Sequence, residues 1–192
     1  SLAIGTRASV TADYGIAIGL FTSVTGNSGV AIGNNSTAGT GALAMRSGTA
    51  SAAGSTALGQ AASATGQNSV AIASTYNAGL AAGIWGAEAT GSGSVAIGSI
   101  SRASGTRSIA IGSGSYHSGG LPVTYTGDYT ESSGTYSIAL GRGVTAQAYA
   151  SLAVGQFNVI SGTIGSWLSA EPLFVIGNGT AYNSRSNAIT VL

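Results

Sequence analysis

The chain has 192 residues, a formal net charge of +1 and charged side chains at only 6% of its positions, with 32 Gly and no Cys. The six basic residues are all Arg and are scattered along the chain, so we expect no nucleic-acid partner. The lack of Cys excludes disulfides, thiolate metal sites and a cysteine nucleophile. No apolar run is long enough to cross a membrane, and we expect no direct membrane insertion.

A five-residue pattern dominates the chain from its first residue: small, apolar, Ala, apolar, Gly. Clear copies lie at 1–5, 15–19, 29–33, 94–98, 108–112, 137–141 and 151–155, and looser copies lie at 42–46, 55–59 and 69–73. Most steps between copies are 13 or 14 residues, and two are longer, from Ala73 to Gly98 and from Gly112 to Gly141. A fixed period of this kind is typical of a solenoid.

A period of about 14 residues predicts one coil of an all-β solenoid, with two short strands and two turns per coil. In the copy at 94–98, Val95 and Ile97 point to one face of the strand and Ala96 to the other. Gly98 ends the strand, where a positive φ or a close backbone approach is easiest without a Cβ atom. Between copies, stretches such as 63–69, 88–94 and 102–108 predict a second strand and a turn.

We expect the Val and Ile side chains of successive coils to stack into the core of the chain. The opposite face carries Ala in nearly every copy and no charge, which predicts that this face is covered by another chain. The predicted chain-facing residues are Ala17, Ala31, Ala96, Ala110, Ala139 and Ala153. The alternative is a monomeric solenoid with a flat, exposed alanine face.

Two interruptions break the period, at 74–93 and at 116–136. We expect the first to replace one coil, and the sequence around Tyr125 to form a protruding hairpin. Loops on a rigid scaffold often carry binding residues. The candidate ligand-binding residues of the second interruption are Tyr116, His117, Tyr125, Asp128, Tyr129, Glu131 and Tyr136. Alternatively, both loops bury their aromatic side chains against a neighbouring chain, or are disordered.

Catalysis and cofactor binding are not indicated. The chain has one His, no Cys and no Lys, and the carboxylates of Asp128 and Glu131 fit a solvated loop better than a catalytic pair. Calcium-binding coils would repeat a Gly-Gly-x-Gly-x-Asp pattern, whereas Asp13 and Asp128 are the only Asp residues. We therefore expect no enzyme, no metal and no cofactor.

The motifs "SVAIGS", "SIAIGSGS", "GVAIGNNS" and "SIALGRG", at 14-residue steps, resemble the head repeats of trimeric autotransporter adhesins, the YadA-like heads. The resemblance covers 1–155 and implies a left-handed parallel β-roll, a homotrimer, and display on the outer surface of a Gram-negative bacterium. It also implies attachment to host matrix protein, a glycan or a surface receptor, with an outer-membrane anchor in another region. Residues 171–192 resemble the pieces that follow such repeats in bacterial and phage fibres, and we expect 156–192 to be a capping or neck-proximal segment.

In this last segment we expect Trp167, Leu168 and Phe174 to cap the roll, since solenoid ends must be sealed. The chain lacks an initiating Met and begins and ends in strand-like sequence, so we expect it to be part of a longer protein. Three functions fit the sequence: an adhesin head, a receptor-binding or spacer segment of a phage or injection-system fibre, and an ice-binding solenoid. Ice binding is the weakest, because Thr25, Thr65 and Thr90 do not form a regular array.

Overall fold

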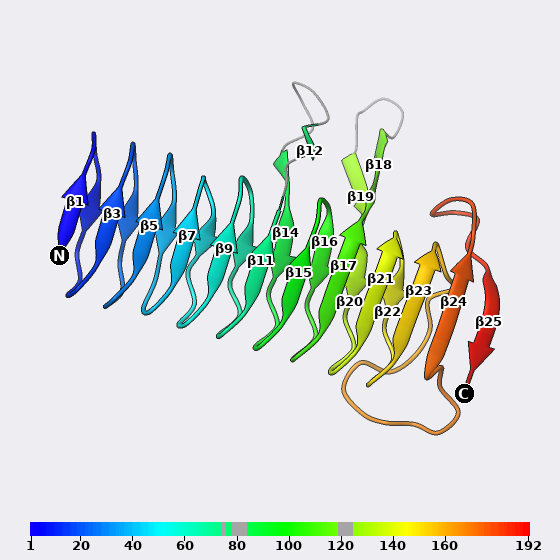
Figure 1. The fold of residues 1–192 in the computed structure, drawn as a ribbon. Helices are drawn as coiled ribbons and strands as arrows, with labels where there is room; N and C mark the ends of the chain where they lie inside the picture. The colour runs from blue at the N-terminus through cyan, green and yellow to red at the C-terminus, as the bar shows by residue number, and fades with distance from the viewer. Residues whose placement is uncertain (74–75, 78–83, 119–124) are drawn as a thin grey trace.

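The computed structural model describes residues 1–73, 76–77, 84–118 and 125–192; for 76–77, 84–85, 115–118 and 125–127 it describes the backbone alone. Each coil from the first to the one with β21 and β22 adds one strand to each of two sheets, which produces the elongated roll in Figure 1. The described residues form strands and turns and contain no helix. The predicted all-β parallel roll is therefore confirmed.

Sheet I, as far as it is described, has 12 strands, and its neighbours are parallel except for the last pair, which is antiparallel. Its strands are β1 (Leu2–Ile4), β3 (Ile16–Ile18), β5 (Val30–Ile32), β7 (Leu43–Met45), β9 (Thr56–Leu58), β11 (Val70–Ile72), β15 (Val95–Ile97), β17 (Ile109–Ser113), β21 (Ile138–Arg142), β23 (Leu152–Gln156), β24 (Phe174–Asn178) and β25 (Asn187–Val191).

Sheet II has nine strands within the same described residues, and all its neighbours are parallel. Its strands are β2 (Ser9–Val10), β4 (Ser23–Val24), β6 (Thr37–Ala38), β8 (Thr49–Ala50), β10 (Ser63–Ala64), β14 (Ala87–Ala89), β16 (Ser101–Ala103), β20 (Thr130–Ser132) and β22 (Thr145–Ala146). We call the corner that leads from sheet I to sheet II turn 1, and the corner that leads back turn 2.

Every copy of the repeat forms a strand of sheet I, and the copies stack in register. Ala96, for example, pairs with Ala71 on one side and with Ala110 on the other. The segment after 155 adds a further coil that the sequence analysis missed, since β24 continues the parallel register with Val175 opposite Ala153. In this copy Val175 replaces the usual Ala, so the copy does not match the five-residue pattern.

The prediction that the alanines face another chain is wrong. Ala17, Ala31, Ala96, Ala110 and Ala139 are fully buried, and Ala153 nearly so, inside the roll of a single chain. They meet the inner column of sheet II, which in register order is Val10, Val24, Ala38, Ala50, Ala64, Ala89, Ala103, Ser132 and Ala146. The Val and Ile side chains that the sequence analysis placed in the core point outward instead.

The narrow coil explains this inversion. Strands of two or three residues joined by tight turns hold the two sheets so close that little more than a methyl group fits from each side. The strand-end glycines reflect the same crowding: Gly98 has φ +113°, and a Cβ atom there would lie 1.9 Å from the carbonyl oxygen of Gly112 in the next coil. The columns that face each other across the regular coils therefore consist mainly of small side chains, and the Val and Ile side chains of the repeat lie outside.

Both interruptions are insertions at turn 1, so the prediction that the first replaces a coil is wrong. β12 (Tyr76–Asn77) pairs antiparallel with β13 (Ile84–Trp85), and β18 (Ser115–Ser118) pairs with β19 (Tyr125–Asp128). The predicted hairpin around Tyr125 is confirmed. β14 and β20 then resume sheet II in register, and both hairpins protrude along the same edge of the roll (Figure 1).

The C-terminal end of the roll is closed by residues other than those predicted. Asn158 is buried, and its side-chain amide accepts a hydrogen bond from the Thr145 N–H at 2.8 Å and donates to the Thr145 carbonyl at 2.9 Å, as a further strand would. Phe157 is buried beside it. Trp167 and Leu168 are about half exposed, so the prediction that they cap the roll is wrong.

Candidate functional site: the outer surfaces of the roll

The outer face of sheet I consists of two rows of side chains that are large and apolar except at Thr56. One row starts each strand: Leu2, Ile16, Val30, Leu43, Thr56, Val70, Val95, Ile109, Ile138, Leu152 and Phe174. The other lies two residues further on: Ile4, Ile18, Ile32, Met45, Leu58, Ile72, Ile97, Ile111, Leu140, Val154 and Ile176. None of these side chains is buried in the single chain, so an apolar surface runs the length of the roll.

The outer face of sheet II is polar, and its row changes character along the roll. In register order the outward residues are Ser9, Ser23, Thr37, Thr49, Ser63, Glu88, Arg102, Glu131 and Thr145. The first five coils thus carry hydroxyl groups alone. The next three coils carry the charged residues Glu88, Arg102 and Glu131. Glu88 follows the first hairpin in the chain, and Glu131 follows the second.

These three charged residues and Tyr129 form one connected cluster. The Arg102 Nε donates to Glu88 Oε2 at 2.9 Å. The guanidinium of Arg102 also lies over the Tyr129 ring, 3.7 Å from its centroid. The Tyr129 hydroxyl donates to Glu88 Oε1 at 3.3 Å, so Glu88 accepts from both partners. Each side chain of this cluster is half-buried.

Partial burial changes the acid–base behaviour of the cluster. Burial, together with the negative charge of Glu88, raises the pKa of Tyr129 to about 12. Burial also raises the pKa of Glu131, although the positive charge of Arg102 partly offsets it. Burial lowers the pKa of Arg102, but the hydrogen bond and charge of Glu88 outweigh it and hold that pKa above its ordinary value. Tyr129 is therefore neutral at neutral pH.

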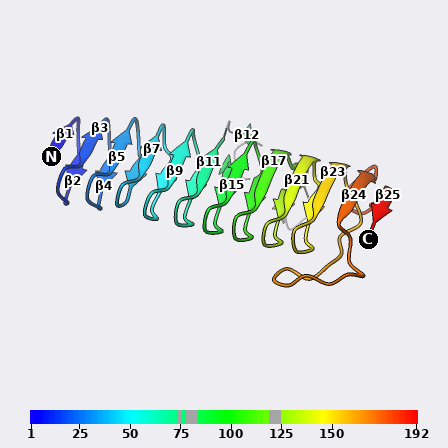
Figure 2. The same cartoon turned by 60° about the horizontal axis from the view of Figure 1, so that its bottom comes forward.

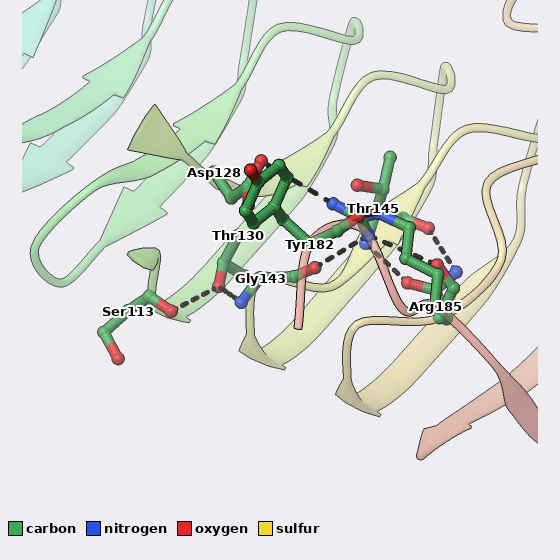
Figure 3. Close-up of polar contacts among 8 residues, drawn as sticks. Ser113, Asp128, Thr130, Gly143, Thr145, Tyr182 and Arg185 are labelled. Atoms are coloured by element: carbon green, nitrogen blue, oxygen red, sulfur yellow. Dashed lines mark hydrogen bonds and ion pairs between the residues drawn. The ribbon is translucent and has the colours of Figure 1, made fainter. Parts of the chain in front are cut away.

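The base of the second hairpin is tied to the C-terminal segment (Figure 3). Arg185 Nη1 donates to the carbonyl oxygens of Gly143 at 3.1 Å and Asn158 at 3.2 Å, and its Nη2 lies 3.9 Å from Asp128 Oδ1. The buried Thr130 hydroxyl lies 2.9 Å from the Gly141 carbonyl and accepts from the Gly143 N–H at 3.2 Å. These contacts fix where β19 ends and β20 begins.

The structure does not bring all the predicted ligand-binding residues together. Tyr116, His117 and Tyr125 lie on the strands of the hairpin, and Asp128 lies at its base. Tyr129 and Glu131 lie beyond the hairpin, in the charged cluster on sheet II.

Tyr136 is separate from these residues, so its assignment to the same loop is wrong. It lies at turn 2, on the opposite edge of the roll, with φ +60°. There Arg107 Nη1 donates to its hydroxyl at 2.6 Å, and its ring meets Tyr149 edge-on with centroids 5.6 Å apart.

Sequence reasoning missed Glu88, Arg102 and Arg185 as neighbours of the predicted residues. Glu88 and Arg102 were detectable: they are 14 residues apart and occupy the position that holds Ser or Thr in the second strand of earlier coils. Aligning the second strands as well as the first would have placed Glu131 in the same row. Arg185 gave no such signal, because it lies outside the repeats.

The chain is thus a parallel β-roll built from repeats. Its interior is filled by buried side chains, and its apolar rows and charged cluster lie on the outer faces of the two sheets. The family model of the YadA head domain repeat matches residues 1–22, 50–72, 89–115, 127–143 and 132–158, which together make up more than half of the chain. The chain therefore belongs to the YadA head domain family. No curated protein sequence matches the chain.

This family consists of surface-exposed adhesin domains and is not an enzyme family. Within the described part of the chain, no three His, Cys, Asp or Glu side chains are grouped as a metal site would require. In that same part, no helix is long and apolar enough to cross a membrane.

Proposed function

We propose that this chain is the head of a homotrimeric adhesin that attaches a bacterium to host matrix protein, a glycan or a surface receptor. The observation that carries the proposal is the apolar outer face of sheet I, which runs the length of the roll with Thr56 as the one polar side chain in the two rows of the described strands. YadA-type heads are trimeric and bind host surfaces, which supports the same assignment. The head lies outside the cell and is attached to the outer membrane through another region of the protein.

The argument for assembly rests on the area and chemistry of that face. Soluble monomers rarely expose contiguous apolar patches larger than a few hundred Å². Here two rows made mainly of Ile, Val and Leu side chains continue over 11 parallel strands, and Val191 and Ile189 of β25 extend them opposite Phe174 and Ile176. Turning the three copies of sheet I toward a common axis buries these rows from all copies at once.

In such a trimer, sheet II and the charged cluster face away from the axis, because the two sheets lie on opposite sides of each roll. The two hairpins protrude at turn 1, along one edge of the roll (Figure 1). We place ligand recognition on the hairpin of β18 and β19 and on the adjoining Tyr129 and Glu131. The regular coils offer mainly Ser and Thr, whereas this region combines aromatic, charged and hydrogen-bonding groups.

The mass in solution tests the assembly. We expect multi-angle light scattering to give three times 18.4 kDa for the intact chain. Ile109→Glu with Ile111→Glu places two charges on the apolar face and should yield monomers, since an unpaired charge is costly to bury. Thr106→Glu at an exposed turn is the control and should remain trimeric. A folded monomer of the intact chain at micromolar concentration would contradict the proposal.

Replacement of the hairpin tests recognition separately. Exchanging 116–127 for a short Gly-Ser link keeps Asp128, Tyr129 and sheet II in place and should leave the trimer folded by circular dichroism. Adhesion to collagen-coated, fibronectin-coated and glycan-array surfaces should fall at least about tenfold relative to the intact head, as expected when a central contact is lost. The matched control replaces 76–85 in the same way. Equal adhesion by all three proteins would place recognition elsewhere on the roll.

A further inference from the structure

We propose that Arg107, Tyr136 and Tyr149 form a second ligand site, which binds a carboxylate-bearing pyranose ring of a glycan: a sialic acid or a hexuronic acid. The three residues lie at turn 2 of three successive coils. Turn 2 is the edge from which the loop before β24 extends in Figure 2, and the hairpins leave the roll at the other edge. The site lies within one chain, so it depends on neither the proposed trimer nor the hairpins.

Arg107 and Tyr136 occupy a backbone position that favours other residues. Their φ angles are +54° and +60°, in the left-handed region that Gly and Asn adopt most easily. The same position holds Asn68 and Gly93 in the two preceding coils. Both Arg107 and Tyr136 are exposed, so packing within the chain offsets little of this strain. Strained residues of this kind are enriched at functional sites, which directs attention to what these two side chains can bind.

The guanidinium of Arg107 is held in place but still has donors to offer. Its Nη1 donates to the Tyr136 hydroxyl at 2.6 Å, and its central carbon lies 5.6 Å from the centroid of that ring. Within the part of the chain that the structure describes, its Nε and Nη2 groups have no hydrogen-bond partner and no carboxylate pairs with it. Gly93 leaves the flank beside Arg107 open. A guanidinium in this state can bind a carboxylate through two parallel hydrogen bonds.

The two tyrosines provide a surface for the sugar ring next to this cation. Their rings meet edge-on at an interplanar angle of 76°, which holds the Tyr136 ring in place, and Tyr136 is 42% exposed. The weakly positive C–H groups of a pyranose pack against the negative face of an aromatic ring. The Tyr136 hydroxyl accepts from Arg107, so its own hydrogen remains available to a sugar hydroxyl.

The chemistry of this corner favours an acidic glycan over a polypeptide. An extended peptide binds through a free strand edge or through side-chain pockets. Here the N–H groups of Arg107 and Tyr136 already donate to carbonyl oxygens of the preceding coils. The adjoining side chains are those of Thr106 and Thr135. One cation, an aromatic surface and several hydroxyl groups instead match a ligand with a single negative charge and many hydroxyls.

Surface plasmon resonance on the immobilised intact chain tests the ligand class. The probes are sialyllactose, a hyaluronan tetrasaccharide that carries glucuronic acid, and neutral lactose. We expect at least one acidic saccharide to bind at least about tenfold more tightly than lactose, because its carboxylate gains charge-assisted hydrogen bonds. The tighter of the two acidic saccharides identifies the kind of acid that the site prefers.

Substitutions then test the residues. Arg107→Asn and Tyr136→Asn should each weaken binding of the preferred acidic saccharide at least about tenfold. Arg107→Lys keeps the charge but not the paired donors, so it should weaken binding at least about threefold. The matched controls Arg7→Asn and Tyr14→Asn remove the same groups from exposed corner residues of the first coil, both with φ +58°, and should bind as the intact chain does.

Stability separates a ligand site from a structural contact. Because Asn68 adopts the same conformation, Asn at 107 or 136 fits the backbone. The unfolding temperature by circular dichroism should therefore not fall, and the mass by light scattering should not change. A lower unfolding temperature or a lower mass in either variant would assign Arg107 and Tyr136 to the fold or to a contact between copies, and would overturn the inference.

The remaining outcomes also decide the question. The inference is wrong if no acidic saccharide binds better than lactose, if Arg7→Asn loses as much binding as Arg107→Asn, or if a glutamate tripeptide binds as tightly as the preferred saccharide. None of these results bears on the proposed attachment through the hairpin. Exchange of 116–127 should leave saccharide binding unchanged, so failure of the hairpin proposal and failure of this site are distinguishable.

Discussion

Sheet I and sheet II of this roll are alike on their inner faces and opposite on their outer faces. Inside, both present columns of small side chains that are almost completely buried, such as Ala96 in sheet I and Ala103 in sheet II. Outside, sheet I presents Ile, Val and Leu, whereas sheet II presents Ser, Thr and three charged residues. The inner faces therefore build the roll, and the difference between the outer faces determines what each side contacts.

The largest expected effect comes from the inner faces and should be the same in both sheets. Ala96→Glu and Ala103→Glu each force a charge into an interior that has room only for methyl groups, so each should cost at least about 4 kcal/mol of unfolding free energy and abolish the cooperative thermal transition by circular dichroism. The control Thr106→Glu should change little. A folded, monomeric Ala96→Glu chain would mean that the alanines do not fill the interior.

A second prediction concerns how the two sheets end. Sheet I is closed by the antiparallel strand β25, whereas the backbone of Thr145 at the end of sheet II is paired with the side chain of Asn158. Asn158→Leu leaves the N–H and carbonyl of Thr145 without that partner, so we expect a loss of about 2 kcal/mol in urea unfolding. Asn183→Ala at an exposed position should have no measurable effect. Equal stability of the two variants would show that the amide does not seal the sheet.

The smallest effect should come from Glu131 on the outer face of sheet II. Its pKa is raised in the folded state, so its ionisation disfavours the fold, and stability gains as the pH falls through that raised value toward the ordinary 4.5. Glu131→Gln should remove this gain from the pH dependence of urea unfolding. Arg102 and Glu88 are the charged groups that act on Glu131, so both are retained in the variant. Asp13→Asn, in an exposed turn, is the control of equal charge, and an identical pH profile for both variants would contradict the assignment.

The repeat in the sequence predicts the roll, its strands and the register of its coils, because the same residue types return every 13 or 14 positions. It does not predict which face lies inside. Alternation in "SVAIGS" separates Ala96 from Val95 and Ile97, but hydrophobicity alone favours the larger side chains for the core. The two sheets lie so close together that the smaller Ala side chains fill the interior instead. This close spacing accompanies short strands of mostly two or three residues, and the sequence shows the length of a strand only as the interval between glycines.

The candidate site was predictable in part. The hairpin around Tyr125 follows from local composition, since Gly and alternating Thr and Tyr surround it. The cluster of Glu88, Arg102 and Glu131 depends on the register of sheet II, so it becomes visible only when the second strand of every coil is aligned. The contact of Arg185 with the hairpin base joins residues more than 50 positions apart, and Arg185 lies outside the repeats, so no local pattern carries that information.

Both hairpins leave the roll at turn 1, and the chain returns to sheet II without a change of register. Each insertion enters and leaves through antiparallel strands whose ends lie side by side, so a segment of different length or sequence can be exchanged there while the neighbouring coils keep their hydrogen bonds. The roll is thus a rod, and the hairpins along one of its edges can be exchanged without a change in the coils. Foreign peptides can therefore be displayed at a fixed distance along the roll from its first coil.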